Sequence, residues 1–240
     1  MSDLSSMTTT FSLVERHLRS NSQTSVSSGM LAYLANLETV ASVAPEIARS
    51  IIQELADQRS NIKLIASENY SSLATQCAMS NLLTDKYAEG IPKRRFYAGC
   101  DNVDDIEEIA ATRARELFGS PHAYVQAHSG ADANLVAFWA ILRARVELPT
   151  MGELLGVDKP EELTPADWIK MPIEQWNKVR HALGNQRLLG MELASGGHLT
   201  HGYRLNASAK MFEAHGYTVD RSTYLLDYDA IERQAIEVKP

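Results

Sequence analysis

The N-terminal quarter of the chain changes from an irregular polar stretch to a strongly periodic helical pattern. Residues 1–29 are rich in Ser and Thr and show no sustained apolar period, which predicts a mobile arm with a short helix around Phe11–Leu18. Across Met30–Arg59, apolar residues recur at helical spacing, and Pro45 marks a break. The pattern therefore predicts two consecutive helices that pack on a partner or on the domain body.

The next segment contains the clearest single helix of the sequence. Val103–Phe118 follows Asp101 and Asn102, either of which can cap it, and Gly119 suits a left-handed C-terminal cap. Acidic residues fill its first turn, where they suit the positive end of the helix dipole. Before this helix, the pattern predicts a short extended segment, a helix and a loop rich in Tyr, Gly, Lys and Arg: Ile62–Ala66, Ser72–Leu83 and Asp85–Cys100.

Beyond Gly119, short apolar runs typical of strands alternate with helical patterns. The expected strands are Ala123–Ala127, Leu188–Leu193 and Tyr217–Val219. The expected helices are Gly130–Arg145, Asn206–Phe212 and Tyr228–Val238, the last capped by Asp227. A charged stretch with several prolines, at about 146–187, interrupts the alternation and predicts a surface insertion of short helices. The alternation itself predicts an α/β fold with a mainly parallel sheet.

The sequence ends at Pro240, directly after a helical pattern with an apolar face. A parallel sheet needs a further strand after each crossover helix. We therefore expect residues 1–60 to form an arm with helices, and residues 61–240 to form part of an incomplete large domain.

Composition narrows the class of protein. The chain has 23 Lys and Arg against 30 Asp and Glu, a formal net charge of −7, and 45% hydrophobic residues, which is typical of a soluble globular protein. The acidic balance argues against a nucleic-acid binder. The longest apolar run, Leu135–Leu142, is too short to span a bilayer, and no secretory leader is visible. We expect a cytoplasmic protein, which suits two widely separated cysteines.

One candidate site is the segment Ala127–Asn134, which lies between an expected strand and an expected helix. Backbone N–H groups would point outward at the start of that helix, where the dipole is positive, and such a site can hold a phosphate. The alternative is an ordinary Ser-capped helix after a Gly turn.

A second candidate is the loop Gly196–Gly202, which places His198 and His201 three residues apart between glycines. The loop permits an imidazole stacked on a flat ligand, because glycines allow close approach. It also permits a metal pair, for which His128 is the only obvious third ligand. A purely structural loop is the remaining alternative.

A third candidate begins at Tyr87, which shares one face of an extended segment with Glu89 and is followed by cations and Tyr97. A carboxylate beside phenols and cations can act as a proton-transfer group. The alternative is that Glu89 is a surface ion-pair partner. Ser67–Asn69 is, on local grounds alone, a polar turn or a helix cap.

Taken in order, six motifs make this sequence resemble serine hydroxymethyltransferases. They are Leu64–Asn69 (LIASEN), Lys86–Gly90 (KYAEG), Arg95–Cys100 (RFYAGC), Glu116–Gly119 (ELFG), His128–Ala131 (HSGA) and Gly196–Gly202 (GGHLTHG). The resemblance spans about 61–145 and 188–240 and is interrupted only by the insertion. It is strongest to members with a longer N-terminal region and a similar insertion.

The resemblance implies the N-terminal half of a pyridoxal 5'-phosphate-dependent transferase with the aspartate aminotransferase fold, fold type I. It implies reversible transfer of the hydroxymethyl group of serine to tetrahydrofolate, the co-substrate, which gives glycine and 5,10-methylenetetrahydrofolate. It also implies a homodimer or larger homo-oligomer with shared active sites.

The resemblance assigns cofactor contacts residue by residue. Ser129, Gly130 and Ala131 match the turn that holds the cofactor phosphate. His198 matches the imidazole that stacks on the pyridine ring, and Tyr87 matches a phenol that reaches the phosphate of the partner subunit. No residue matches a metal ligand.

Substrate contacts follow in the same way. Glu89 matches the acid/base group close to the substrate hydroxymethyl group and the folate, with Tyr87 and Tyr97 as neighbouring phenols. Ser67 matches a contact to the amino-acid carboxylate. The folate contacts are matched by Leu193, Gly197 and Leu199.

Departures from the family pattern bear on activity. Phe96 stands where many members have Tyr, and Asp132 stands where many have Gln. The family's cofactor-binding lysine, the aspartate that pairs with the ring nitrogen, the histidine after it and the carboxylate-binding arginine would all lie beyond Pro240. We therefore expect no turnover from this chain alone. The alternatives are a non-catalytic half-protein that binds or complements a separate C-terminal half, and a His-based metal enzyme.

Overall fold

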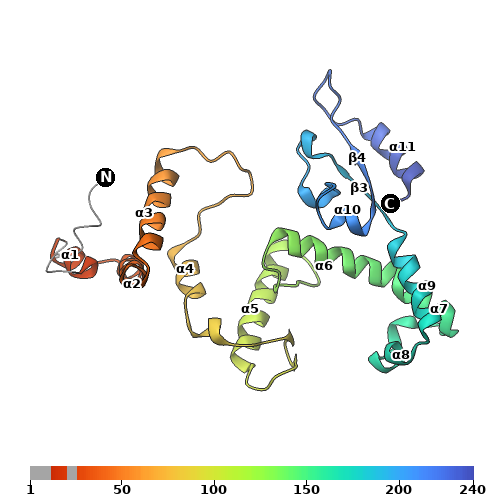
Figure 1. Cartoon of the computed structure of the whole chain (residues 1–240), viewed down its shortest axis with the longest axis horizontal. Coiled ribbons are helices and arrows are strands. Elements are labelled where there is room, and N and C mark those ends of the chain that lie inside the picture. Colours follow the sequence, from red (N-terminus) through yellow and green to blue (C-terminus); the bar gives the residue numbers. More distant parts are fainter. Residues whose placement is uncertain (1–11, 21–25) are drawn as a thin grey trace. The chain divides into compact units, whose positions relative to one another are not determined.

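The computed structural model of the chain describes residues 12–20 and 26–240 (Figure 1). Its internal contacts divide it into two compact units, Met1–Ile109 and Ala110–Pro240, and each unit is described by itself. None of the helices in the described ranges combines the length and the apolar character needed to cross a bilayer. The boundary expected near residue 60 coincides with the end of a helix and stays a prediction.

The first unit begins with three helices, α1 (Leu13–Ser20), α2 (Ser28–Val43) and α3 (Pro45–Ser60). The predicted pair of helices with a break at Pro45 is confirmed, and Pro45 occupies the first turn of α3, where its missing N–H costs nothing. Leu37 of α2 and Ala48 of α3 are buried where these two helices pack. The short helix predicted around Phe11–Leu18 is found two residues later, as α1, and Phe11 lies outside the described residues.

Of two further predictions in this unit, the short extended segment is not a paired strand, and the predicted helix needs correction. Ile62–Ala66 pairs with no strand of the described residues and ends in a turn, in which the Glu68 N–H donates to the Ile65 carbonyl at 3.0 Å. The helix predicted over Ser72–Leu83 ends early: α4 covers Leu73–Met79, and a separate 3-10 turn, η2, covers Leu82–Asp85. The Asn81 side chain accepts from the Leu83 N–H at 2.8 Å and so starts the new turn.

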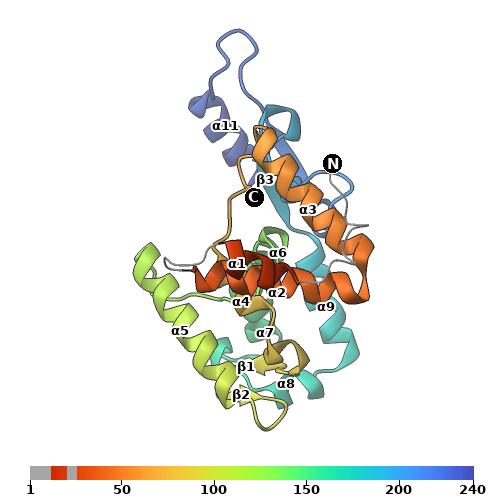
Figure 2. The same ribbon diagram turned by 90° about the vertical axis from the view of Figure 1, so that its left-hand side faces the viewer.

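The loop predicted over Asp85–Cys100 contains a very short antiparallel hairpin, β1 (Gly90–Ile91) with β2 (Arg94–Arg95). It leads into α5 (Asp101–Phe118), and Figure 2 labels all three elements. The prediction that Asp101 or Asn102 caps this helix is wrong, because both lie inside it and the Cys100 carbonyl accepts the Asp104 N–H at 2.9 Å. Gly119 has φ 61°, as a left-handed C-terminal cap requires.

In the second unit, α6 (Gly130–Leu142) continues through a π-helical turn, η3 (Arg143–Glu147), into α7 (Leu148–Leu155). The wider turn accommodates Pro149, which has no N–H to donate to the preceding turn. The strand predicted over Ala123–Ala127 is wrong, since within the described ranges this segment pairs with no other strand.

The predicted insertion consists of short helices, as expected: α7, the 3-10 turn η4 (Pro160–Glu162), α8 (Pro165–Lys170) and α9 (Ile173–Gly184). These helices enclose a small core of their own, in which Met151 and Val179 are fully buried. Trp168 and Trp176 meet edge to face beside it, with ring centroids 6.4 Å apart. The insertion is thus a packed helical element rather than a loose excursion.

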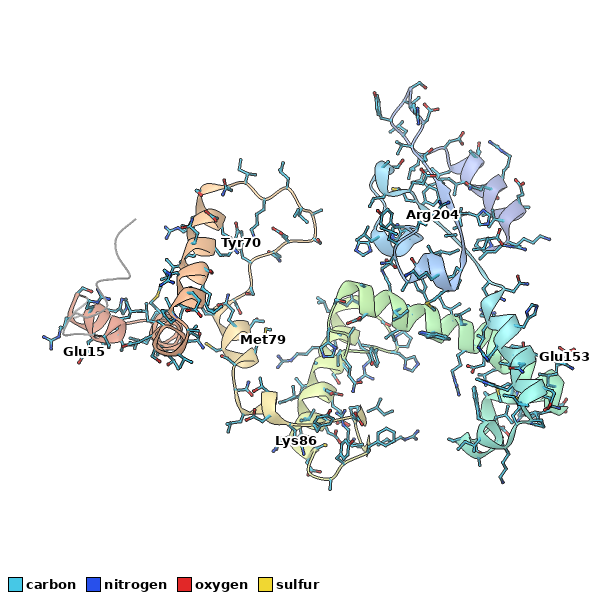
Figure 3. All side chains as sticks on the ribbon, viewed as in Figure 1. Glu15, Tyr70, Met79, Lys86, Glu153 and Arg204 are labelled. Atoms are coloured by element: carbon cyan, nitrogen blue, oxygen red, sulfur yellow. The ribbon has the colours of Figure 1, made fainter. Side chains whose placement is uncertain are left out.

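Replacing Met151 by Ala is expected to destabilise this element by about 2–5 kcal/mol, because the deletion leaves a cavity in a core that is closed on all sides. Urea unfolding of the 240-residue chain, followed by tryptophan fluorescence, measures the loss. Met79→Ala is the matched control: Met79, labelled in Figure 3, is 73% exposed, and its truncation should change the free energy of unfolding by less than about 0.5 kcal/mol. Equal effects of the two substitutions would contradict the existence of this core.

The rest of the unit is built on two parallel strands, β3 (Arg187–Met191) and β4 (Glu213–Tyr217), drawn in blue in Figure 1. Between them lie two 3-10 turns, η5 (Leu193–Ser195) and η6 (Leu199–His201), and α10 (Ser208–Met211). The helix α11 (Tyr228–Val238) has the predicted bounds, and the Asp227 side chain accepts from the Ala230 N–H at 2.9 Å.

The second strand lies earlier in the chain than predicted. Its position follows from pairing with β3, in which Arg187 faces Glu213 and Met191 faces Tyr217, so the predicted strand Tyr217–Val219 overlaps it at one residue only. Of the expected mainly parallel sheet, the described residues form only this one parallel pair; the other strand pairing among them is the antiparallel hairpin within the first unit. The described part of the chain is therefore mixed α/β and mostly helical.

Candidate active site

In the first unit, Glu89 lies in a cluster with the two tyrosines predicted beside it. The Tyr97 hydroxyl donates to Glu89 Oε2 at 3.2 Å, and the rings of Tyr97 and Tyr87 meet edge to face with centroids 5.8 Å apart. Tyr87 is 69% exposed and Tyr97 48% exposed, so the cluster is open to solvent within its own unit. A carboxylate held by a phenol at an accessible position can accept a proton from a bound ligand.

A buried thiol contacts the backbone of both tyrosines and can donate to one of their carbonyl groups at a time. Cys100 is 4% exposed, and its Sγ lies 3.4 Å from the Tyr97 carbonyl and 3.6 Å from the Tyr87 carbonyl, to which it can donate. Lys86, labelled in Figure 3, donates from Nζ to the Ala98 carbonyl at 3.3 Å and closes the same loop. Side chain to backbone bonds of this kind provide partners for carbonyl groups that lie outside the short hairpin.

The cluster is anchored on α5 through Asp104. The Lys93 N–H donates to its Oδ2 at 2.8 Å, and the Arg95 guanidinium lies against its Oδ1 at 2.8 Å. These contacts, the Lys93 N–H first, hold the pKa of Asp104 below its usual range. Because the pKa of Asp104 is lower in the folded chain than in the unfolded chain, its ionisation stabilises the folded chain at pH values above the ordinary pKa of 3.8. This contribution to stability is lost as the pH falls through the lowered pKa.

Ser67 is not brought into this cluster. It lies in the turn that follows Ile62–Ala66, where Lys63 pairs with Glu68 at 3.2 Å and lies over the Tyr70 ring. No hydrogen bond of the described residues joins Ser67 to Glu89. Its predicted role at the substrate carboxylate stays a prediction.

In the second unit, Ser129 caps α6, since its Oγ accepts from the Asp132 N–H at 3.0 Å. Ser129, Gly130 and Ala131 are all exposed, and a Cβ added at Gly130 would meet nothing within 4 Å. The first N–H groups of a helix have no partner within it, so those of Gly130 and Ala131 remain available. The turn therefore fits a phosphate group, with the positive end of the helix dipole behind it.

A chain of hydrogen bonds joins this helix to His198. Asn134 in the first turns of α6 donates from Nδ2 to Thr200 Oγ1 at 2.7 Å, and Thr200 Oγ1 lies 2.8 Å from His198 Nδ1. The Thr200 N–H also donates to His198 Nδ1, at 3.2 Å. Thr200 is buried, and its hydroxyl oxygen accepts the hydrogen bond from the Asn134 amide. The hydroxyl hydrogen is therefore available to donate to the imidazole.

These bonds fix the orientation of both histidines in the loop. His198 Nδ1 is an acceptor, so the neutral ring carries its proton on Nε2. His201 Nδ1 likewise accepts, from the His198 backbone N–H at 3.1 Å. Both Nδ1 atoms are thus engaged in the loop, and the exposed His198 ring is left with its face and its Nε2 for a ligand.

The loop Gly196–Gly202 lies directly against β3 and β4, and glycines make this possible. A Cβ at Gly190 of β3 would lie 2.8 Å from both the Cβ and the carbonyl oxygen of His201. A Cβ at Gly197 would collide with the Met191 carbonyl. Beside the loop lies a cavity of about 360 Å³, lined by residues that include Leu193, His198 and Arg204, the last labelled in Figure 3. Of the three residues matched to folate contacts, Leu193 and Leu199 are about half exposed and Gly197 is partly buried.

Four residues that contact or position these side chains are not indicated by the sequence pattern: Cys100, Arg95, Asn134 and Thr200. Asn134 and Thr200 both lie inside candidate segments of the sequence, but 66 residues separate them. Their polarity beside apolar neighbours was the available signal. Nothing in the local pattern marks Arg95 as buried, because it follows two other cations, Lys93 and Arg94.

Comparison with known proteins identifies similar sequences over most of the chain. A family model described as serine hydroxymethyltransferase matches residues 40–161 and 178–240, and the unmatched 162–177 lies inside the insertion. Three proteins named serine hydroxymethyltransferase are similar to this chain. The protein of Treponema pallidum (strain Nichols) is 56% identical to it over 95% of the chain, that of Salinispora tropica is 54% identical over 87%, and that of Chlamydia trachomatis serovar D is 45% identical over 95%. The chain covers 38%, 42% and 45% of these relatives, respectively.

Proposed function

Because this chain belongs to the serine hydroxymethyltransferase family, we propose that it supplies the N-terminal part of the active site of an enzyme that transfers the hydroxymethyl group of serine to tetrahydrofolate. The proposal includes fold type I, pyridoxal phosphate as cofactor, a cytoplasmic location and a homodimer or larger assembly. The observation that carries it is the hydrogen-bond chain from Asn134 through Thr200 to His198, since it joins a helix whose start fits a phosphate group to an oriented imidazole.

Two parts of the second unit fit the cofactor. Pyridoxal phosphate, when bound, withdraws electrons from the amino-acid substrate so that a bond to its α-carbon can break. The N–H groups of Gly130 and Ala131, with the Ser129 turn, would bind the phosphate. The His198 ring, held by Thr200 with Nδ1 as acceptor, would stack on the pyridine face.

The cluster of the first unit fits the acid/base role. The Glu89 carboxylate would accept the proton of the serine hydroxyl as the bond between the α- and β-carbons breaks. The β-carbon would then leave at the oxidation level of formaldehyde and pass to tetrahydrofolate, the bonding electrons would stay on the glycine side, and Glu89 would return the proton in the reverse direction. The Tyr97 hydroxyl, which donates to Oε2, would keep that oxygen engaged and leave Oε1 for the substrate. Ser67 would bind the substrate carboxylate, and Tyr87 would reach the phosphate of the partner subunit. Leu193, Gly197 and Leu199 would contact the folate.

A fusion experiment tests the proposal. Residues 1–240 are joined to the remaining C-terminal part of the Treponema pallidum relative, giving what is here termed the completed enzyme. We expect it to form glycine from serine and tetrahydrofolate, whereas the 240-residue chain alone does not turn over and gives no single stoichiometric pyridoxyl-lysine adduct after borohydride reduction with pyridoxal phosphate. The reason is that the family's cofactor-binding lysine is expected outside residues 1–240.

The control is the N-terminal part of the Treponema pallidum relative, rejoined to its own C-terminal part at the same point. An active control beside a folded but inactive completed enzyme would contradict the proposal and favour a non-catalytic binding half. A single adduct in the 240-residue chain, for example at Lys210, would contradict the expected inactivity of that chain.

A further inference from the structure

Among the described Lys and Arg residues of the first unit that form an ion pair, Arg95 has the most deeply buried side chain. Its side chain is 4% exposed, although it lies in a two-residue strand between the exposed residues Arg94 and Phe96. A buried guanidinium is costly unless its N–H groups are matched by acceptors. The acceptors around the Arg95 guanidinium therefore indicate the role of this side chain.

Two carboxylates of α5 hold the guanidinium from one side. Arg95 Nε donates to Asp104 Oδ1 at 2.8 Å, and its second terminal nitrogen lies 2.9 Å from Glu107 Oε2. Asp104 and Glu107 are three residues apart and share one face of an 18-residue helix, so they form a stable base for the planar guanidinium.

On the other side, one nitrogen of Arg95 holds the backbone around Glu89. The NH1 group donates to the Ala88 carbonyl at 2.8 Å and to the Gly90 carbonyl at 3.0 Å. These are the residues immediately before and after Glu89. In addition, the Phe96 N–H donates to the Glu89 carbonyl at 3.0 Å, so the residue after Arg95 binds the backbone of Glu89 itself.

We propose that Arg95 is a positioning residue for Glu89: it ties the peptide units on both sides of that carboxylate to α5 and so fixes where the carboxylate meets the substrate. The proposal rests on the proposed acid/base role of Glu89. Lys cannot replace Arg95 fully, since an ammonium group has no planar array of donors that reaches two carboxylates and two carbonyls at once.

The test compares Arg95→Lys with Arg94→Ala, which removes a neighbouring exposed cation with no resolved ion pair. In the completed enzyme, Arg95→Lys should lower kcat by about 10- to 100-fold, because small displacements of a reacting group have effects of this size. The KM for serine should change less than threefold. Arg94→Ala should leave both constants unchanged.

A second measurement does not depend on turnover. Hydrogen exchange of the Phe96 amide, measured in the full 240-residue chain, should become at least tenfold faster in Arg95→Lys and stay unchanged in Arg94→Ala. A purely structural arginine would lower the melting temperature while folded Arg95→Lys kept its normal kcat and its Phe96 protection, and that result would overturn the proposal.

The outcome for Glu89 separates this inference from the proposed function. If Glu89→Gln is inactive while Arg95→Lys has normal kcat, only the positioning role of Arg95 fails. If Glu89→Gln itself has normal turnover, the acid/base role fails, and slower turnover of Arg95→Lys must then arise elsewhere in the loop, which also rejects the inference.

Discussion

Replacing Glu89 by Gln in the completed enzyme lowers kcat by about 100-fold or more, while serine binding changes little. Gln keeps the size of the side chain and can still accept the Tyr97 hydroxyl proton in a hydrogen bond, but it cannot take up a proton from the substrate. Steady-state kinetics with serine and tetrahydrofolate, together with serine binding by calorimetry, measure the two effects separately.

Glu153→Gln is the charge-matched control for this experiment. Glu153, labelled in Figure 3, is an exposed residue of α7 in the insertion, and its substitution should leave kcat unchanged. If Glu89 were only a surface group, its Gln variant would behave like this control, with a change of about 1 kcal/mol or less in stability and none in rate. Near-normal turnover of Glu89→Gln would remove this residue from the site.

Replacing His198 by Ala in the completed enzyme is expected to weaken pyridoxal phosphate binding by about 10-fold, and replacing it by Phe by less. An aromatic pair contributes up to about 1.5 kcal/mol, and Phe preserves the ring face while it loses the hydrogen bond from Thr200. Cofactor binding is measured by fluorescence titration, and a chelator should not change it.

A metal site makes the opposite prediction for the same loop. There, His201 would be as important as His198, both Phe variants would be inactive, and a chelator would abolish activity until zinc was restored. The His201 ring accepts the His198 N–H through Nδ1, so under stacking His201→Phe should have a smaller effect than His198→Ala. Loss of activity on chelation, reversed by zinc, would overturn the stacking assignment.

The elements predicted well from the sequence are those whose ends are fixed by neighbouring residues. Asp227 at the start of α11, Ser129 at the start of α6 and Pro45 at the start of α3 all act within one helical turn. The strands were predicted less well. The position of β4 depends on its pairing with β3, and the paired residues Arg187 and Glu213 are 26 positions apart in the sequence. Ala123–Ala127 has an apolar run, but it pairs with no strand in the described ranges.

The candidate site divides in the same way. The segments that carry Glu89, Ser129 and His198 could be found from motifs, because each motif is continuous in the sequence. The contacts that orient them are not continuous: the Asn134 to Thr200 bond joins residues 66 positions apart, and the Arg95 guanidinium receives its acceptors from both α5 and the hairpin. Spacing alone does not encode such contacts.

The close fit of the His198 loop on β3 also limits how this region can evolve. Gly190 and Gly197 contribute no ligand contact through a side chain, yet any Cβ at these positions would press on His201 or on the Met191 carbonyl. A Cβ at Gly184, at the end of α9, would meet nothing within 4 Å. Selection at Gly190 and Gly197 therefore acts against any side chain, for steric reasons alone. In a saturation mutagenesis library, substitutions at these two positions should be as rare as substitutions of a catalytic residue.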